Sequence, residues 1–179
     1  LSCARLDPKN KFELIIHALP TILAKYPKLI WCIIGKGVEE NILQALVKEK
    51  GLLNHVRFVG EIYDESKLAP WFLSSELFIH PAAVGLSILH AFGYGLPLIT
   101  NGNKSFHNPE YAAFEDGLTG LNFIENDFND LASVILKLLE DYETRNRMKL
   151  YTKKIVQEKY NSEVMVDRFL KIINKAASD

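Results

Sequence analysis

The sequence predicts an α/β fold in which a doubly wound parallel sheet carries helices on both faces. Apolar runs of strand length alternate with amphipathic stretches of helix length, and repeated β-α units need crossovers between parallel strands. Residues 29–35 are almost entirely apolar, which is typical of a strand covered on both faces. The 179 residues suit a single domain, 1–179, with a substantial core.

The apolar runs predict about six strands, and the stretches between them predict the helices. In the first helix, Phe12, Ile15, Ile16 and Leu19 recur at helical spacing. The strands are expected at 2–6, 29–35, 56–59, 77–80, 96–100 and 119–123. The helices between them are expected at 10–25, 38–50, 65–73, 85–94 and 108–114. From about residue 126 the chain is expected to be helical, with polar breaks near 141–144 and 160–162, so these C-terminal helices depart from the β-α alternation.

Composition and charge exclude several classes of protein. Hydrophobic residues make up 48% and charged residues 24%, as in ordinary folded soluble proteins. The formal net charge of −1 gives no reason to expect a nucleic-acid partner. No apolar run approaches the roughly 20 residues of a membrane span, and no signal peptide opens the chain. A cytoplasmic location is therefore expected.

The cysteines and the first residue add two further expectations. Cys3 and Cys32 lie in apolar runs, and two cysteines are too few for a disulfide scaffold. We expect buried thiols in a reducing compartment. Leu1 opens the chain without a methionine, inside an expected strand, so we expect a domain excised from a longer protein.

Ligands of doubly wound folds lie beyond the carboxyl ends of the strands, so the functional site is expected in the loops there. The first loop carries Arg5 and Lys11, two cations that can converge on one anion. Two solvated surface cations are the alternative. The second loop holds Gly35, Lys36 and Gly37, and its glycines either let the backbone approach a ligand or simply make the turn.

Several other chemistries lack the residues they need. Glu40 stands where a dinucleotide-binding fingerprint requires a third glycine or an alanine, which argues against NAD or FAD. The histidines and cysteines show no metal-ligand spacing. Ser87 lies in no Gly-x-Ser-x-Gly elbow. Only Asp7 follows the first strand, where a phosphorylation-receiver domain requires an acidic pair.

The fourth loop is the most informative. It leads into an apolar helix, and the N–H groups of Gly85, Leu86 and Ser87 are expected at the start of that helix. Free amides and the helix dipole favour an anion there. His90 follows about one turn further on, and it is either a ligand contact or a satisfied core histidine.

Together these loops resemble the C-terminal, donor-binding domain of retaining GT-B glycosyltransferases of family 4. The likeness runs from residue 1 to about residue 159, and its motifs follow the order of the family. They are Ala4-Arg5-Leu6 with Lys11; Ile33-Ile34-Gly35-Lys36-Gly37; Val56-Arg57-Phe58-Val59-Gly60; Leu77-Phe78-Ile79-His80-Pro81; Gly85-Leu86-Ser87-Ile88-Leu89; Gly95-Leu96-Pro97-Leu98-Ile99; and Asp116-Gly117-Leu118-Thr119-Gly120-Leu121.

The resemblance implies a role for each loop. It implies that the donor is a nucleotide sugar of the UDP or GDP type. The diphosphate-binding residues that it implies are Arg5, Lys11, Gly85, Leu86 and Ser87. The base-pocket residues that it implies are Gly35, Lys36, Gly60 and Glu61. No metal or other cofactor is expected, because the cations and the helix amides offset the charge of the leaving diphosphate.

One motif departs from the family. Two glutamates usually stand eight positions apart around the fourth loop. The second, which holds the ribose hydroxyls, falls on His90 here, and a neutral imidazole can still hydrogen-bond one hydroxyl. The first, which contacts the transferred sugar, falls near Ala82 in a loop about three residues shorter. No catalytic residue can be assigned from the sequence.

The expected function is that of the donor-binding half of a glycosyltransferase, which transfers a sugar to a glycan, a lipid-linked precursor or a polysaccharide precursor. The acceptor-binding N-terminal domain is expected to be absent from this chain, and the whole enzyme to contact the inner face of the membrane peripherally. The alternatives are a non-catalytic nucleotide-binding relative of the same fold and, third, an epimerase or phosphorylase of similar architecture.

Overall fold

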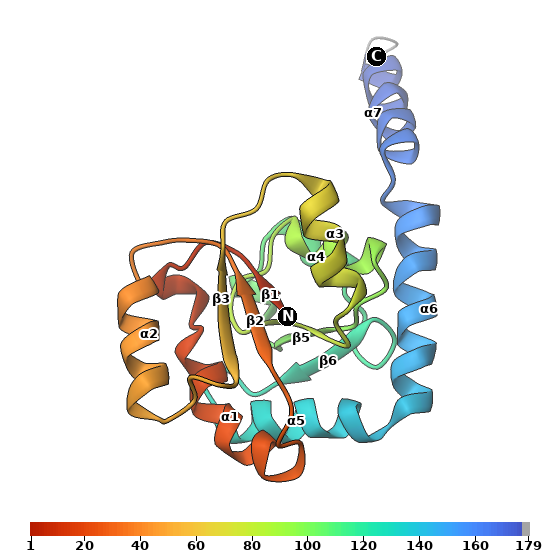
Figure 1. Cartoon of the computed structure of the whole chain (residues 1–179). Coiled ribbons are helices and arrows are strands. Elements are labelled where there is room, and N and C mark those ends of the chain that lie inside the picture. The colour runs from red at the N-terminus through yellow and green to blue at the C-terminus, as the bar shows by residue number, and fades with distance from the viewer. Residues whose placement is uncertain (177–179) are drawn as a thin grey trace.

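The computed structural model describes residues 1–176, which form six strands with helices packed on both faces (Figure 1). The strands are β1 (Ser2–Cys3), β2 (Trp31–Ile34), β3 (Val56–Gly60), β4 (Phe78–His80), β5 (Leu98–Asn101) and β6 (Gly120–Phe123). They form two three-stranded parallel sheets, in the orders β1-β2-β3 and β4-β5-β6. The predicted number and parallel direction of the strands are therefore confirmed.

Hydrogen bonds between β1, with the residue before it, and β4, with the residue before it, join the two sheets. The backbone nitrogen of Leu1 donates to the carbonyl of Leu77 at 2.9 Å, and the amide of Ile79 donates to the carbonyl of Leu1 at 2.8 Å. The buried hydroxyl of Ser2 donates to the carbonyl of Ile79 at 2.6 Å and accepts from the indole nitrogen of Trp31 at 3.0 Å. The six strands are thus arranged in the order β3-β2-β1-β4-β5-β6. Successive strands are added toward one edge after β1 and toward the other edge after β4.

Helices cover the two faces of this surface, and alternate residues of the strands pack under them. Ile33 and Ile79 belong to the core beneath α1, α2 and α5. Their neighbours Ile34 and Phe78 belong to the core beneath α3, α4 and the C-terminal part of α6. The predicted doubly wound fold is therefore confirmed. These helices are α1 (Glu13–Lys25), α2 (Glu40–Glu49), α3 (Glu65–Leu73), α4 (Ser87–Gly93), α5 (Phe128–Glu140) and α6 (Tyr142–Lys159).

Aspartates fix the starts of several helices. Asp64, before α3, and Asp127, before α5, each accept a hydrogen bond from the amide two residues later, at 2.9 Å and 2.8 Å. Asp141, before α6, accepts one from the amide three residues later at 2.9 Å. A side-chain acceptor at this position satisfies an amide that has no partner inside the helix. The chain therefore turns from loop to helix at positions that its own side chains determine.

Some details differ from the sequence-based expectations. The helix expected at 85–94 begins at Ser87, and the segment expected at 108–114 is the 3₁₀ helix η3 (Pro109–Ala113). Two further 3₁₀ turns, η1 (Pro8–Asn10) and η2 (Lys104–Phe106), follow β1 and β5. The cysteines are free, as expected, but they are half-buried rather than fully buried, and Cys32 lines a hollow.

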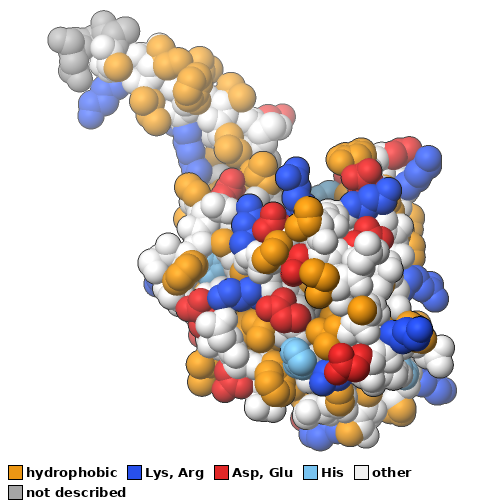
Figure 2. Space-filling view, turned by 90° about the vertical axis from the view of Figure 1, so that its left-hand side faces the viewer, with side chains coloured by type: hydrophobic (Ala, Val, Ile, Leu, Met, Phe, Trp, Pro, Cys, Tyr) orange, Lys and Arg blue, Asp and Glu red, His pale blue; other side chains and the backbone are white. Residues whose placement is uncertain are grey.

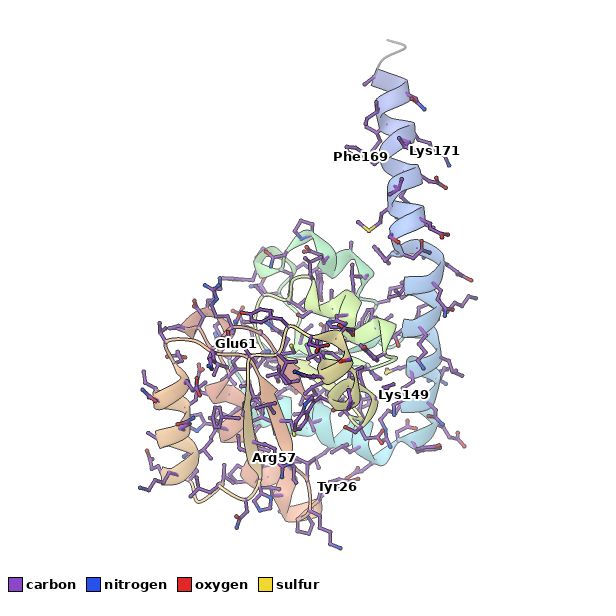
Figure 3. The ribbon with its side chains drawn as sticks, turned by 45° about the horizontal axis from the view of Figure 1, so that its top comes forward. Tyr26, Arg57, Glu61, Lys149, Phe169 and Lys171 are labelled. Carbon is purple, nitrogen blue, oxygen red and sulfur yellow. The ribbon has the colours of Figure 1, made fainter. Side chains whose placement is uncertain are left out.

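The last described helix, α7 (Ser162–Ala176), projects away from the body of the molecule (Figures 1 and 2). It is amphipathic, and Phe169 and Lys171 extend from opposite sides of it (Figure 3). None of its residues is buried, and the side chain of Phe169 is 64% exposed. Because the stability of a helix in a protein comes mainly from its packed face, α7 contributes little to the stability of the body.

Removal of α7 should leave the thermal stability of the body almost unchanged. A chain that ends at Tyr160 is expected to unfold within about 2 °C of the full chain, because the deleted helix buries no side chain. The matched control is Ile155→Ala in α6, a side chain that is 4% exposed. That variant is expected to lose about 2–5 kcal/mol of unfolding free energy. A large loss of Tm on truncation would contradict the independence of the body from α7.

Candidate functional site

The carboxyl ends of β1 and β4 are neighbours at the point where the strand order reverses. The chain after β1 leads to α1 on one face, and the chain after β4 leads to α4 on the other face. Ligands of doubly wound folds bind at such a point. The loops after β1, β2, β3 and β4, together with the first turns of α3 and α4, therefore make up the candidate site.

The loop after β2 lies directly against the loop after β1. The amide of Leu6 donates to the carbonyl of Lys36 at 3.0 Å. A Cβ atom on Gly35 would lie 2.0 Å from the carbonyl oxygen of Ala4, and a Cβ atom on Gly37 would lie 2.0 Å from that of Leu6. Gly35 also has a positive φ of 140°. Both glycines are thus required by the contact between the two loops, which is a structural role that needs no ligand.

The four residues predicted for the base pocket are brought together. The amide of Gly35 donates to the carbonyl of Gly60 at 2.9 Å, and the ammonium of Lys36 lies 3.9 Å from the carboxylate of Glu61. Tyr63 extends this group, since its hydroxyl donates to Glu61 at 3.0 Å. The side chain of Glu61 lies in the loop that leaves β3 (Figure 3). These residues form an exposed polar rim beyond β2 and β3.

The two predicted phosphate-binding cations have partners in opposite directions along the sheet. Arg5 is exposed. The hydrogen bond to Glu61 raises the pKa of Tyr63, which follows β3, and the positive charge of Arg5 opposes this rise. Lys11 donates to Glu125 at 3.1 Å and to Asn126 at 2.8 Å, both after β6. Lys11 therefore has to exchange a carboxylate for a phosphate if it is to act together with Arg5.

The start of α4 presents the predicted amides. Within the described residues, the amides of Gly85, Leu86 and Ser87 have no protein acceptor. The segment before them is fixed, because the amide of Val84 donates to Nδ1 of His107 at 3.2 Å. The other ring nitrogen of His107 donates to a backbone carbonyl at 2.9 Å, which determines the tautomer. Three unpaired donors at a helix start can donate hydrogen bonds to a bound anion.

His90 is neither a core histidine nor an unpartnered one. Its side chain is 34% exposed, and its Nε2 lies 3.0 Å from the carboxylate of Glu65 at the start of α3. One face of its ring stacks on Phe72, with the ring centroids 4.8 Å apart. Tyr94 also donates its hydroxyl to Glu65. The predicted ribose contact is therefore part of a polar group that joins α3 to α4.

Several members of the site were not predicted from the sequence. Glu65 and Tyr94 complete the group around His90, and Glu125 binds Lys11. Hydrogen bonds from Asn103 and Lys11 lower the pKa of Glu125, so it stays ionised. Sequence gives little signal for these residues, since a glutamate in the first turn after an aspartate cap is ordinary helix composition.

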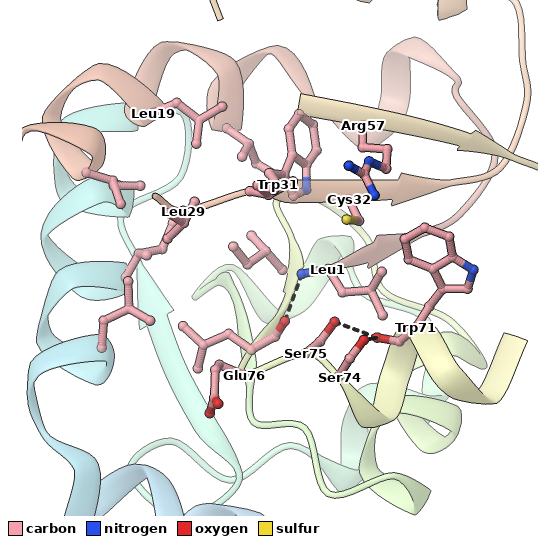
Figure 4. Close-up of a pocket in the computed structure, with 17 residues that line it drawn as sticks. Leu1, Leu19, Leu29, Trp31, Cys32, Arg57, Trp71, Ser74, Ser75 and Glu76 are labelled. Carbon is pink, nitrogen blue, oxygen red and sulfur yellow. Dashed lines mark hydrogen bonds between the residues drawn. The ribbon is translucent and has the colours of Figure 1, made fainter. Parts of the chain in front are cut away.

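A hollow of about 370 Å³ lies at the opposite end of the strands (Figure 4). Leu1, Trp31 and Leu77, at the amino ends of β1, β2 and β4, line it together with the ends of α1 and α3. Its acid, Glu76, is already paired with Arg145 and Lys149 of α6, at 3.2 Å and 2.6 Å. Arg57 also lines this mainly apolar hollow, but the hollow lies away from the carboxyl ends of the strands, where ligands of doubly wound folds bind.

Metal-ligand clusters and membrane-spanning helices are both absent from residues 1–176. No group of three or more His, Cys, Asp or Glu side chains in this range is arranged to hold a metal ion. Across the same residues, no helix combines the length and the apolar composition needed to cross a membrane.

The fold is shared with solved structures of other proteins. HepE of Anabaena, solved in complex with UDP, superimposes with a TM-score of 0.81 at 20% identity, over 97% of this chain and 48% of that one. The C-terminal domain of the group 1 family protein LpcC from Francisella tularensis superimposes with a TM-score of 0.76 at 21% identity, over 90% of this chain and 85% of that one.

Residues 1–155 match the family described as Glycosyl transferases group 1, and the chain belongs to this family. The predicted resemblance is therefore confirmed. A phosphatidyl-myo-inositol mannosyltransferase of Mycobacterium leprae is 22% identical over 176 residues, which cover 96% of this chain and 45% of the relative. The chain spans less than half the length of the first curated relatives that it matches.

His80, at the end of β4, is a buried titratable group beside the candidate site. It is 2% exposed, its Nδ1 lies 3.3 Å from the carbonyl of Ala82, and its ring meets the ring of Phe12 edge to face. Burial lowers the pKa of His80 to about 4. An unfolded histidine has a pKa near 6.5. Between that pH and about 4, His80 therefore binds a proton in the unfolded state and not in the folded state.

Stability should therefore fall as the pH drops from about 6.5 toward 4. Linkage gives a loss of about 2 kcal/mol between pH 7 and pH 5 from His80 alone. Urea unfolding of the wild type and of His80→Gln at both pH values measures this contribution, because glutamine does not titrate. The variant is expected to be less stable at pH 7 and to lose less on acidification. Equal losses in the two proteins would remove His80 as the cause.

Proposed function

We propose that this chain binds the nucleotide-sugar donor of a retaining glycosyl transfer, in which a sugar passes from a nucleoside diphosphate to an acceptor. The observation that carries the proposal is the set of unpaired amides at Gly85, Leu86 and Ser87, beside the loop that bears Arg5. Membership of the group 1 glycosyltransferases supports it, as does the UDP bound by HepE. The donor nucleotide is UDP or GDP.

In the proposed mechanism the protein offsets the negative charge that develops on the leaving diphosphate. The three amides would donate to phosphate oxygens, and Arg5 would add a bidentate charged contact. Lys11 would contribute a second charge once its ammonium leaves Glu125. Lys36 and Glu61 would border the base. The proposal needs no resident metal, because donors of the chain supply the positive charge.

The identity of the transferred sugar depends on groups other than Ala82. That side chain is 5% exposed and has no polar atom, so it cannot replace the glutamate that usually contacts the sugar. A non-catalytic nucleotide-binding relative is accordingly the second candidate function. Nucleotide binding without sugar transfer by the whole protein would favour this second candidate, and transfer to any acceptor would exclude it.

The proposal extends to the whole protein in two ways. We propose that an acceptor-binding domain lies in the remaining part, since the relatives are about twice as long as this chain. We also propose that the whole enzyme contacts a membrane surface peripherally, since the Mycobacterium leprae relative is named for a phosphatidyl-myo-inositol substrate. On this proposal, the isolated chain binds the donor and does not transfer the sugar.

The isolated chain should bind UDP or GDP and should not bind NAD. Isothermal titration calorimetry is expected to give a Kd between about 1 mM and 1 μM, or roughly −4 to −8 kcal/mol. The affinity is modest because one side of the donor is left uncovered. Tight binding of NAD with no response to either diphosphate would overturn the proposed function.

Removal of either cation should weaken the binding of a diphosphate selectively. Arg5→Ala and Lys11→Ala are each expected to cost about 1.5–3 kcal/mol of binding free energy, the range for charge-assisted hydrogen bonds. Affinity for the free nucleoside should hardly change. Lys25→Ala is the matched control, because Lys25 is also ion-paired, with Glu140 at 2.6 Å, but lies at the far end of α1. Equal losses for nucleoside and diphosphate would show that these residues act through folding.

A further inference from the structure

The carboxylate of Glu65 has one oxygen occupied and one free. Oε1 accepts from the hydroxyl of Tyr94 and lies 3.0 Å from Nε2 of His90. Oε2 takes no hydrogen bond within the described part of the chain, and the side chain is 61% exposed. The two bonds to Oε1 lower the pKa of Glu65, so the group is a carboxylate at neutral pH. A held carboxylate with an open oxygen is a ready acceptor for hydroxyl groups.

Glu65 also lies at the functional edge of the sheet. It begins α3, immediately after the loop that leaves β3. Its charge reaches Cys3, at the carboxyl end of β1: burial and then Glu65 raise the pKa of that thiol to about 11. Through His90 it is tied to α4, whose first turn carries the unpaired amides. Glu65 therefore lies close to the carboxyl end of β1, just beyond β3, and in contact with α4.

His90 alone is poorly suited to bind a diol. A carboxylate can only accept, so the Nε2 of His90 must carry the proton that is shared with Glu65. A neutral ring is then left with one acceptor, Nδ1, whose lone pair points away from Glu65. Oε2 of Glu65, 25 residues earlier in the chain, has two lone pairs and can accept from two hydroxyl groups. The free oxygen of Glu65 therefore offers by itself the two acceptor positions that a vicinal diol requires.

We propose that Glu65 is a specificity-determining residue that binds the ribose hydroxyls of the nucleotide, with His90 beside it. The carboxylate that accepts from the diol thus comes from α3 rather than from α4. Tyr94 is a positioning residue, because it acts on the diol only by holding Oε1 of Glu65. This inference rests on the proposed binding of a nucleoside diphosphate.

The test compares UDP and GDP with their 2′,3′-dideoxy analogues by calorimetry on the isolated chain. Glu65→Ala is expected to raise the Kd of the ribonucleotide about tenfold or more, as for loss of a charge-assisted hydrogen bond. The Kd of the dideoxy analogue should stay within about twofold, since it has no diol to lose. Glu49→Ala, an exposed glutamate at the end of α2, is the matched control and should change neither value.

Two further variants distinguish the loss of a contact to the diol from a displacement of α3. Glu65→Gln keeps the side-chain length and an oxygen for Tyr94 and should show the same selectivity with a smaller rise in Kd. The double variant Glu65→Ala with His90→Glu returns a carboxylate to α4 and should recover most of the lost ribonucleotide affinity. A purely structural tether would not be rescued in this way.

The outcomes separate the inference from the function on which it rests. If the wild type binds UDP or GDP and Glu65→Ala weakens ribonucleotide and dideoxy analogue equally, or weakens neither while the Tm falls, Glu65 is only a tether between α3 and α4. If the wild type binds the ribonucleotide and the dideoxy analogue with equal Kd, no residue of the chain binds the diol and the role of Glu65 fails. If the wild type binds no nucleoside diphosphate at all, the proposed function itself fails, and the role of Glu65 fails with it.

Discussion

The buried hydroxyl of Ser2 ties together three strands on which the whole arrangement depends. It donates to the carbonyl of Ile79 in β4 and accepts from the indole of Trp31 in β2, while β1 itself has two residues. A buried hydroxyl without partners would cost free energy, whereas this one has both a donor and an acceptor partner. Because the strand has only two edges, β2 and β4 occupy both of them. Crossovers between parallel strands are right-handed, so the connections that lead from β1 to β2 and from β4 to β5, in opposite directions, pass over different faces. This divergence creates the ligand-binding end of the sheet.

Close packing of backbone against backbone then fixes the loops at that end. Gly35 and Gly37 bring the loop after β2 so near to the loop after β1 that a Cβ atom on either glycine would overlap a carbonyl oxygen. The same loop is bonded to Gly60 at the end of β3. Three loops therefore form one connected rim, and side chains on them, such as Arg5 and Lys36, start from fixed backbone positions. Pre-organised positions of this kind reduce the ordering cost of binding a ligand.

The sequence predicted the fold more fully than the site. Strand-length apolar runs and helical periodicity are local patterns, so the order of the elements and the loops that carry the site could be predicted. The contacts of Lys11 with Glu125 and of His90 with Glu65 join residues 114 and 25 positions apart. They depend on how α1 lies against the end of β6 and how α3 lies against α4, which no local pattern encodes. The two glycines were open to two readings, and only the distances to Ala4 and Leu6 decide between them.

The ion pair between Lys11 and Glu125 has a kinetic consequence. Both side chains are more than two-thirds buried, so an ammonium left without a partner there would be costly. On the proposed role of Lys11, Glu125 competes with the diphosphate for that ammonium and takes it back as the nucleotide departs. The competition weakens binding and shortens the residence time, since differences in affinity between closely related complexes arise mostly in the rate of dissociation. On that role, a carboxylate that never touches the nucleotide would favour the exchange of spent nucleotide for fresh donor.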